Sequence, residues 1–176
     1  NMKIALLGKM GSGKSTCAKY LKEKYDFEIH SFGYPVKKFA KEIFNDNTKN
    51  RSLIQDFAQK VKEIDPNVWV NYLINNADFS KNIVVDDLRF PNEFEVLKAN
   101  GFLIIKLDIS KEFQELRLKA TYPDNFQIHL NRRNDISESF TDILENDYIY
   151  KVDSDNIKKL YSFLDSIIDN YFSIKD

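Results

Sequence analysis

The stretch GKMGSGKST, residues 8–16, has the residue types and spacing of a phosphate-binding loop. Gly8, Gly13, Lys14 and Ser15 satisfy the pattern G-x-x-x-x-G-K-[ST]. The glycines let the backbone curl so that N–H groups point at a phosphate, the lysine reaches the terminal phosphates, and the serine hydroxyl binds magnesium. We therefore predict a triphosphate and Mg²⁺ site here. The residues assigned to it are Gly8, Met10, Gly11, Ser12, Gly13, Lys14, Ser15 and Thr16.

A second group of charged residues lies in the segment VVDDLRFPNE. Asp86 and Asp87 end an apolar run of strand length, where ligands of open α/β sheets bind, and a carboxylate there can hold the magnesium shell or an acceptor hydroxyl. Because side chains alternate along a strand, Asp87 and Arg89 are expected on one side. The guanidinium fork suits a phosphate. Alternatively, these charges cap the helix that begins at Pro91 and pair with each other.

The elements around these two segments alternate along the whole chain. Short apolar or alternating runs predict strands at 3–8, 27–32, 82–87, 102–109 and 147–153. Helical spacing predicts helices at 17–25, 34–44, 51–64, 67–76, 91–101 and 156–172. We therefore expect a single domain over residues 2–176, with the α/β fold of a three-layer P-loop NTPase sandwich and a parallel sheet. Residues 34–78 form a helical insertion for an acceptor.

The segment from Thr121 to Ser139 is polar and long for a connection, and we expect it to be irregular and to act as a lid, counted here as residues 117–139. Arg117 leads into it and is assigned to the nucleotide. Arg132 lies inside it beside Arg133, and lid closure would bring one of the two onto the transferring phosphoryl group, so Arg132 is assigned to catalysis. The alternative is that both arginines are solvated loop charges.

The net charge, the length of the apolar runs and the cysteine content exclude several classes of partner and structure. The formal net charge is −1, from 26 basic and 27 acidic residues, so we expect neither long nucleic acid nor a membrane surface as a partner. No apolar run approaches the ~20 residues of a membrane span. Cys17 is the single cysteine, which excludes an intramolecular disulfide and favours a buried packing role beneath the loop. The chain is expected to be cytoplasmic.

Several segments, taken in order, resemble the deoxynucleoside monophosphate kinases of bacteriophages. These are GKMGSGKST, FGYPVKKFAKEIF, RSLIQDFAQKVKEIDPNVWV, VVDDLRFPNEFEVLKANG, and DISESF followed by DYIYKVDS. Such enzymes are similar in fold to adenylate kinases. The resemblance implies transfer of the γ-phosphate of ATP to a deoxynucleoside 5′-monophosphate with Mg²⁺, in the host cytoplasm, and a possible homodimer. Ser137 and Glu138 resemble the family's lid exit, and also a serine-capped helix start.

The same resemblance implies roles for individual residues. Lys14 and Ser15 keep the phosphate and magnesium roles, and Asp87 lies near the acceptor and the metal. Arg89 grips the acceptor phosphate. The catalytic set is therefore Lys14, Asp87, Arg89 and Arg132, and the metal set is Ser15 and Asp87.

The acceptor site implied by the resemblance consists of Lys37, Arg51, Gln55, Trp69, Arg89 and Glu93. Arg51 and Gln55 are four residues apart and share a helix face. Trp69 is a base-stacking wall or, alternatively, a core anchor, and Glu93 contacts the sugar or stabilises the first turn of its own helix. Tyr34 stands where the family usually has aspartate.

Other functions remain open at this stage. One is a P-loop kinase for another small metabolite, of the phosphomevalonate or dephospho-coenzyme A type. Another is a kinase for a modified base in DNA. From a different class, a nucleotide-binding module without catalysis is possible, although such a module need not keep Lys14, Ser15, Asp87 and Arg89 together.

Overall fold

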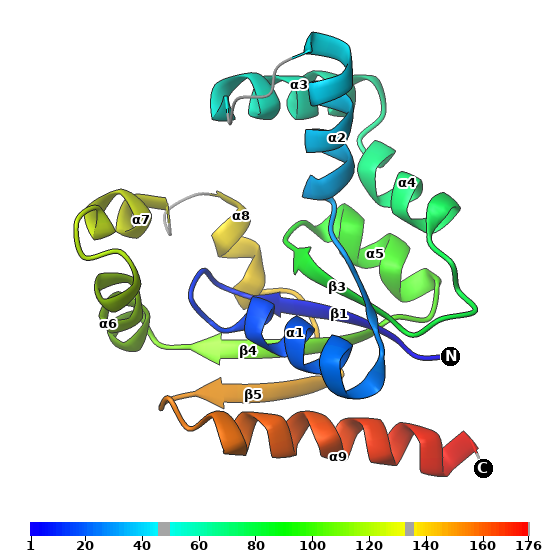
Figure 1. Cartoon of the computed structure of the whole chain (residues 1–176), viewed down its shortest axis with the longest axis vertical. Coiled ribbons are helices and arrows are strands. Elements are labelled where there is room, and N and C mark those ends of the chain that lie inside the picture. Colours follow the sequence, from blue (N-terminus) through cyan, green and yellow to red (C-terminus); the bar gives the residue numbers. More distant parts are fainter. Residues whose placement is uncertain (46–49, 133–135, 176) are drawn as a thin grey trace.

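A five-stranded parallel sheet forms the centre of the molecule (Figure 1). The computed structural model describes residues 1–45, 50–132 and 136–175. The strands are β1 (Lys3–Gly8), β2 (Glu28–His30), β3 (Ile83–Leu88), β4 (Leu103–Ile109) and β5 (Tyr148–Val152). Their order is β2-β3-β1-β4-β5, and all neighbours are parallel. This confirms the expected α/β fold with a parallel sheet.

Helices cover both faces of this sheet, so that β1 is buried on both sides. Ile4 and Leu6 pack in a core with α1 (Lys14–Tyr25) and α9 (Ile157–Lys175). The intervening Ala5 and Leu7 pack in a second core on the opposite face. That second core also holds residues of α2 (Gly33–Phe44), α4 (Val68–Asn76) and α5 (Pro91–Ala99). The alternation along β1 therefore produces the three layers.

Helix α3 (Arg51–Ile64) lies outside these layers, against α2 and α4 (Figure 1). It has no fully buried residue, and its apolar stripe is only partly covered through Ile54, Phe57 and Val61. Ile64, the last residue of the helix, has a side chain that is 86% exposed, so the covered stripe ends one turn before the helix does.

The described residues of the segment 121–139, namely 121–132 and 136–139, are more regular than expected. After α6 (Lys111–Thr121) come the short helices α7 (Phe126–Arg132) and α8 (Ile136–Ser139), followed by a 3-10 turn at Phe140–Asp142. Leu130 of α7 is 8% exposed, and the rings of Tyr122 and His129 stack with centroids 3.7 Å apart. The prediction of an irregular loop is therefore wrong for these residues, because packing of a few side chains stabilises short helices.

No helix among the described residues is long and apolar enough to cross a membrane. Cys17 is fully buried in the core, where burial raises the pKa of its thiol to about 12. This agrees with the packing role expected for it.

Candidate active site

The phosphate loop joins the end of β1 to the start of α1, and its glycines are required by the local geometry. A Cβ on Gly8 would collide with the Ser12 hydroxyl and lie 2.9 Å from the carbonyl oxygen of Leu107. Gly13 precedes α1 with φ of 105°, a left-handed conformation that other residues rarely adopt. The loop can therefore curl tightly against the end of the neighbouring strand β4.

Two side chains of α6 hold the loop from one side. Gln114 is 1% exposed and donates a hydrogen bond from Nε2 to the carbonyl oxygen of Met10, at 2.7 Å. Arg117, one turn later, donates to the carbonyl oxygen of Gly11 at 2.9 Å. Gln114 was not predicted as a site residue, although its position three residues before Arg117 places both on one face of the helix.

The N–H groups and the lysine of the loop have partners within the chain. The backbone N–H of Met10 donates to both carboxylate oxygens of Glu138, at 3.0 and 3.3 Å. The ammonium group of Lys14 donates to the carbonyl oxygen of Gly8. Burial and the nearby charge of Arg89 lower the pKa of Lys14 below its ordinary value. Arg89 therefore lies close enough to the loop for its charge to act on Lys14.

The two aspartates at the end of β3 have different surroundings. Asp87 accepts hydrogen bonds from the backbone N–H of Phe32, at 2.9 and 3.1 Å, and of Gly33, at 3.1 Å. Asp86 is half-buried, and within the described part of the chain no other residue donates a hydrogen bond to its carboxylate. Burial raises the pKa of both groups, with the charge of Asp87 as the second cause at Asp86. The charges of both carboxylates raise the pKa of Lys14, but only Asp87 is held by the backbone N–H groups of another element.

Glu93 is turned toward the backbone of its own helix. It is 6% exposed and accepts hydrogen bonds from the N–H groups of Arg89, at 3.1 Å, and Phe90, at 3.0 Å. Burial raises its pKa to about 7. This geometry is the capping arrangement given above as the alternative to a sugar contact, and it fixes the backbone on which the exposed Arg89 side chain stands.

Phe90, at the start of α5, contacts residues of α3 and of the turn after α8. The ammonium group of Lys62, on α3, lies 4.3 Å from the centroid of the Phe90 ring. The ring of Phe140, just after α8, packs against it edge to face with centroids 5.9 Å apart. Neither contact was predicted from the sequence, because each joins residues far apart in the chain.

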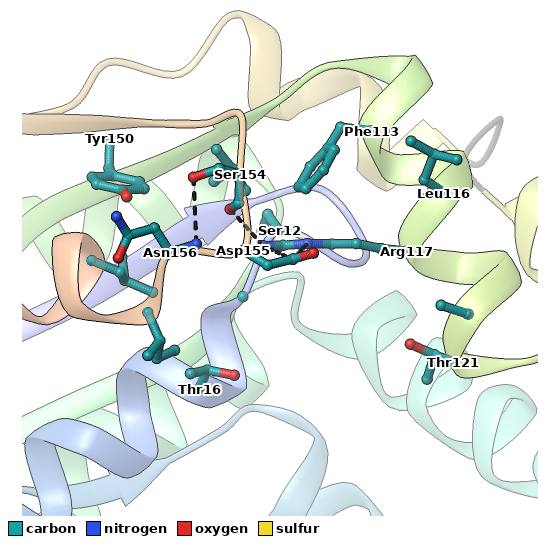
Figure 2. Close-up of a pocket in the computed structure, with 15 residues that line it drawn as sticks. Ser12, Thr16, Phe113, Leu116, Arg117, Thr121, Tyr150, Ser154, Asp155 and Asn156 are labelled. Carbon is teal, nitrogen blue, oxygen red and sulfur yellow. Dashed lines mark hydrogen bonds and ion pairs between the residues drawn. The ribbon is translucent and has the colours of Figure 1, made fainter.

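A cavity of about 490 Å³ opens beside the phosphate loop (Figure 2). Its walls come from the start of α1, from α6, and from the connection between β5 and α9. Arg117 lies along one wall, 4.9 Å from the Phe113 ring and paired with Asp155 at 3.2 Å. The hydroxyl oxygen of Ser12, also at the wall, is buried and has no hydrogen-bond partner among the described residues.

The other residues predicted for the site lie on α2, α3, α4 and α7. Lys37, Arg51 and Gln55 have exposed side chains on α2 and α3. Trp69 is 7% exposed and donates from Nε1 to the carbonyl oxygen of Ala58 at 3.3 Å, a placement that favours the core-anchor alternative. Arg132 is the last residue of α7, but its side chain and the whole of Arg133 lie outside the described part of the chain, as does the side chain of Ser137.

The fold and the site together define a class. A phosphate loop on a parallel sheet of order 2-3-1-4-5, with acidic and basic residues from the neighbouring strand beside its lysine, is the arrangement of a P-loop small-molecule kinase. Residues 4–136 match the AAA domain family, and the chain belongs to this family.

Two proteins of related sequence share about a third or less of the aligned residues with this chain. The chain is 27% identical over 140 residues to a protein of Acanthamoeba polyphaga mimivirus named "Putative deoxynucleotide monophosphate kinase", a match that covers 60% of this chain and 72% of that protein. It is 32% identical over 120 residues to a dephospho-CoA kinase of Fusobacterium nucleatum, covering 68% of this chain and 52% of that protein.

A solved structure agrees with the fold. Shikimate kinase from Acinetobacter baumannii, in complex with shikimate, superposes with a TM-score of 0.58 at 18% identity, covering 96% of this chain and 94% of that one. At this identity the likeness concerns the fold alone.

Proposed function

We propose that this protein transfers the γ-phosphate of ATP to a deoxynucleoside 5′-monophosphate. The observation that carries the proposal is that Asp86, Asp87 and Arg89 lie at the end of β3, beside the end of β1 that leads into the loop of Lys14. The charges of all three act on Lys14. Two cations and two carboxylates at the end of a phosphate loop suit two phosphates and a divalent ion. The similarity to a virus protein named as a deoxynucleotide monophosphate kinase supports this choice of acceptor.

In this proposal the loop holds the donor. The N–H groups between Gly8 and Ser15 bind the β- and γ-phosphates of ATP, and Lys14 leaves the Gly8 carbonyl to neutralise charge on the transferring group. Arg89 binds the acceptor phosphate through its guanidinium fork. An oxygen of that phosphate is the nucleophile, so positioning and charge neutralisation are the main tasks of the protein, and no general base is needed.

Magnesium is expected with ATP, and the residues present fit it. Mg²⁺ prefers oxygen ligands and keeps several waters, so one hydroxyl and one carboxylate suffice beside the phosphates. Ser15 is exposed at the start of α1, and the half-buried carboxylate of Asp86 accepts no hydrogen bond from another residue of the described chain. The ion would neutralise negative charge that develops between the phosphates. We therefore assign Ser15 and Asp86 to the metal, while Asp87, the residue favoured by sequence, acts chiefly by holding the backbone at Phe32 and Gly33.

The cavity next to the loop suits the base and sugar of the donor. It adjoins Ser12, Gly13 and Thr16, so a nucleotide whose phosphates lie on the loop extends directly into it. Arg117 presents its planar guanidinium there, which can stack on a base. The expected nucleotide role of Arg117 is therefore kept in the proposal.

A second candidate acceptor is dephospho-coenzyme A. The observation in its favour is the 32% identity to a dephospho-CoA kinase. In that case the acceptor is a hydroxyl, and a carboxylate at the end of β3 would have to accept its proton. The two candidate acceptors therefore differ in one requirement. Dephospho-coenzyme A needs Asp86 or Asp87 as a general base, and a deoxynucleoside monophosphate needs none.

A thermal-shift panel tests the proposal. Each deoxynucleoside monophosphate, including 5-hydroxymethylated pyrimidines, and dephospho-coenzyme A are added with and without Mg²⁺ and a non-hydrolysable ATP analogue. A ligand that binds only the folded chain raises Tm. We expect a rise with the ATP analogue and with one or more deoxynucleotides. A rise with dephospho-coenzyme A and with no deoxynucleotide would contradict the proposed acceptor.

A further inference from the structure

The contact between Glu138 and the phosphate loop is not explained by the assignments above. Glu138 comes from α8, 128 residues after Met10 in the chain, and both of its carboxylate oxygens lie within hydrogen-bond distance of the Met10 N–H. An N–H group of such a loop is an anion-binding group. Here the anion is a side chain of the same protein.

The neighbouring contacts hold this carboxylate in place. The hydroxyl of Thr141, a residue 3% exposed, donates to the carbonyl oxygen of Glu138 at 2.8 Å. Lys9 of the loop pairs with Asp142 at 3.2 Å. The segment 138–142 is therefore attached to the loop through two separate side chains, and a buried hydroxyl fixes the backbone between them.

The other cation of the loop is also engaged within the chain. Lys14 donates to the carbonyl oxygen of Gly8, and the charge of Glu138 raises the pKa of Lys14, against the larger effect of burial. A nucleotide phosphate needs the same groups that Glu138 and Gly8 now occupy. A carboxylate and a phosphate oxygen at one N–H group would also repel each other.

We propose that Glu138 is a further residue of the phosphate site, where its carboxylate occupies the place of a nucleotide phosphate and is displaced when that phosphate binds. Displacement frees segment 138–142 from the loop at Met10. The same segment packs on Phe90 through Phe140, so occupancy of the donor site is transmitted to the turn that carries Arg89. This inference rests on nucleotide binding in the proposed function and is independent of the acceptor.

Equilibrium titration with inorganic pyrophosphate and with a non-hydrolysable ATP analogue tests this inference. In Glu138→Gln the side chain keeps its size and loses the competing charge, so both Kd values should fall by about tenfold, the worth of one charge-assisted hydrogen bond. Glu145→Gln, an exposed change of equal charge a few residues along the chain, should leave both values unchanged. An unchanged or weaker affinity in Glu138→Gln would overturn the proposal.

A measurement on the unaltered protein gives a second test. Amide hydrogen exchange in peptides covering 136–142 should become faster when pyrophosphate is added, because the tie to Met10 is lost. Slower or unchanged exchange on binding would contradict displacement. If the unaltered protein binds neither pyrophosphate nor the ATP analogue, the nucleotide-binding part of the proposed function fails. If it binds both and Glu138→Gln binds no tighter, only the inference about Glu138 fails.

Discussion

The carboxylate of Asp87 accepts the backbone N–H of Phe32, at 2.9 and 3.1 Å, and so ties the end of β3 to the start of α2. Asp86, its neighbour in sequence, receives no hydrogen bond from another described residue. Adjacent residues on a strand point to opposite faces, which explains why two identical side chains have different surroundings. The two aspartates therefore have separate proposed roles. Asp86 binds the metal, and Asp87 positions the backbone at Phe32.

Substitution of each aspartate tests this separation. Asp86→Asn should lower kcat by about 100-fold or more and raise the Mg²⁺ concentration needed for activity, with the free energy of unfolding little changed. Asp87→Asn should lower the free energy of unfolding by about 1–2 kcal/mol, because an amide replaces a carboxylate acceptor of two backbone N–H groups. Kinetics against Mg²⁺ and urea unfolding measure both. The reverse pattern would assign the metal to Asp87.

The guanidinium of Arg89 is predicted to bind the acceptor. Arg89→Lys keeps the charge but loses the planar fork, so KM for the acceptor should rise by about tenfold while KM for ATP stays the same. Lys158→Arg is the comparison, because it keeps the charge of an exposed residue on α9 that belongs to neither substrate site. Steady-state kinetics with each substrate varied measures the effect. Equal changes in both KM values would show that Arg89 does not distinguish acceptor from donor.

Arg117 is predicted to act on the donor nucleotide alone. Arg117→Ala removes the guanidinium from the cavity and its hydrogen bond to Gly11, so the Kd for an ATP analogue should rise by about tenfold, with acceptor binding unchanged. Asp155→Asn removes the ion pair with Arg117, in which the aspartate is exposed. The free energy of binding of the ATP analogue should then change by less than about 1 kcal/mol. Calorimetric titration measures both. A similar loss of affinity for the ATP analogue in the two variants would mean that the ion pair with Asp155, and not stacking of Arg117 on the base, supports nucleotide binding.

Glu93 should give the unfolding free energy a defined dependence on pH. Burial raises its pKa from 4.5 to about 7 in the folded chain. The folded state then holds a proton that the unfolded state releases above about pH 4.5, so its contribution is fully present below that pH and is lost as pH rises to about 7. This corresponds to about 3 kcal/mol, since a tenfold change is ~1.4 kcal/mol.

Glu93→Gln isolates this contribution, because an amide does not titrate. Urea unfolding of both proteins is measured between pH 4.5 and 8, and the unaltered protein should lose free energy of unfolding relative to Glu93→Gln as pH rises. A difference that does not vary with pH would mean that Glu93 titrates like an exposed carboxylate.

The sequence predicts the layers well because local patterns determine them. The apolar runs at β1, β3 and β4 and the glycines of the phosphate loop are each explained by a few neighbouring residues. The site is predicted less completely. Lys62 and Glu138 contact Phe90 and the loop from elements far away in the chain, and no local spacing indicates such contacts. For Gln114 the one local signal is that it shares a helix face with Arg117. The different surroundings of Asp86 and Asp87 likewise depend on how α2 follows β2.

The stabilised helices in the segment 121–139 were missed for a similar reason. Phe126 and Leu130 have helical spacing, but the segment around them is polar and short, so α7 depends on packing against α6 rather than on intrinsic propensity. For Trp69, the residue type alone allows two different placements. A tryptophan close to an expected acceptor site is equally compatible with a wall or a core position, and only its burial against Ala58 and Phe57 distinguishes them.

The central claim concerns the acceptor, and direct product analysis tests it. The protein is incubated with ATP, Mg²⁺ and, in separate reactions, each deoxynucleoside monophosphate or dephospho-coenzyme A, and products are separated by anion-exchange chromatography with Lys14→Ala as the inactive control. We predict a deoxynucleoside diphosphate from at least one deoxynucleotide, at a rate that Lys14→Ala reduces by about 1,000-fold or more. Formation of coenzyme A, with no diphosphate from any deoxynucleotide, would contradict the account.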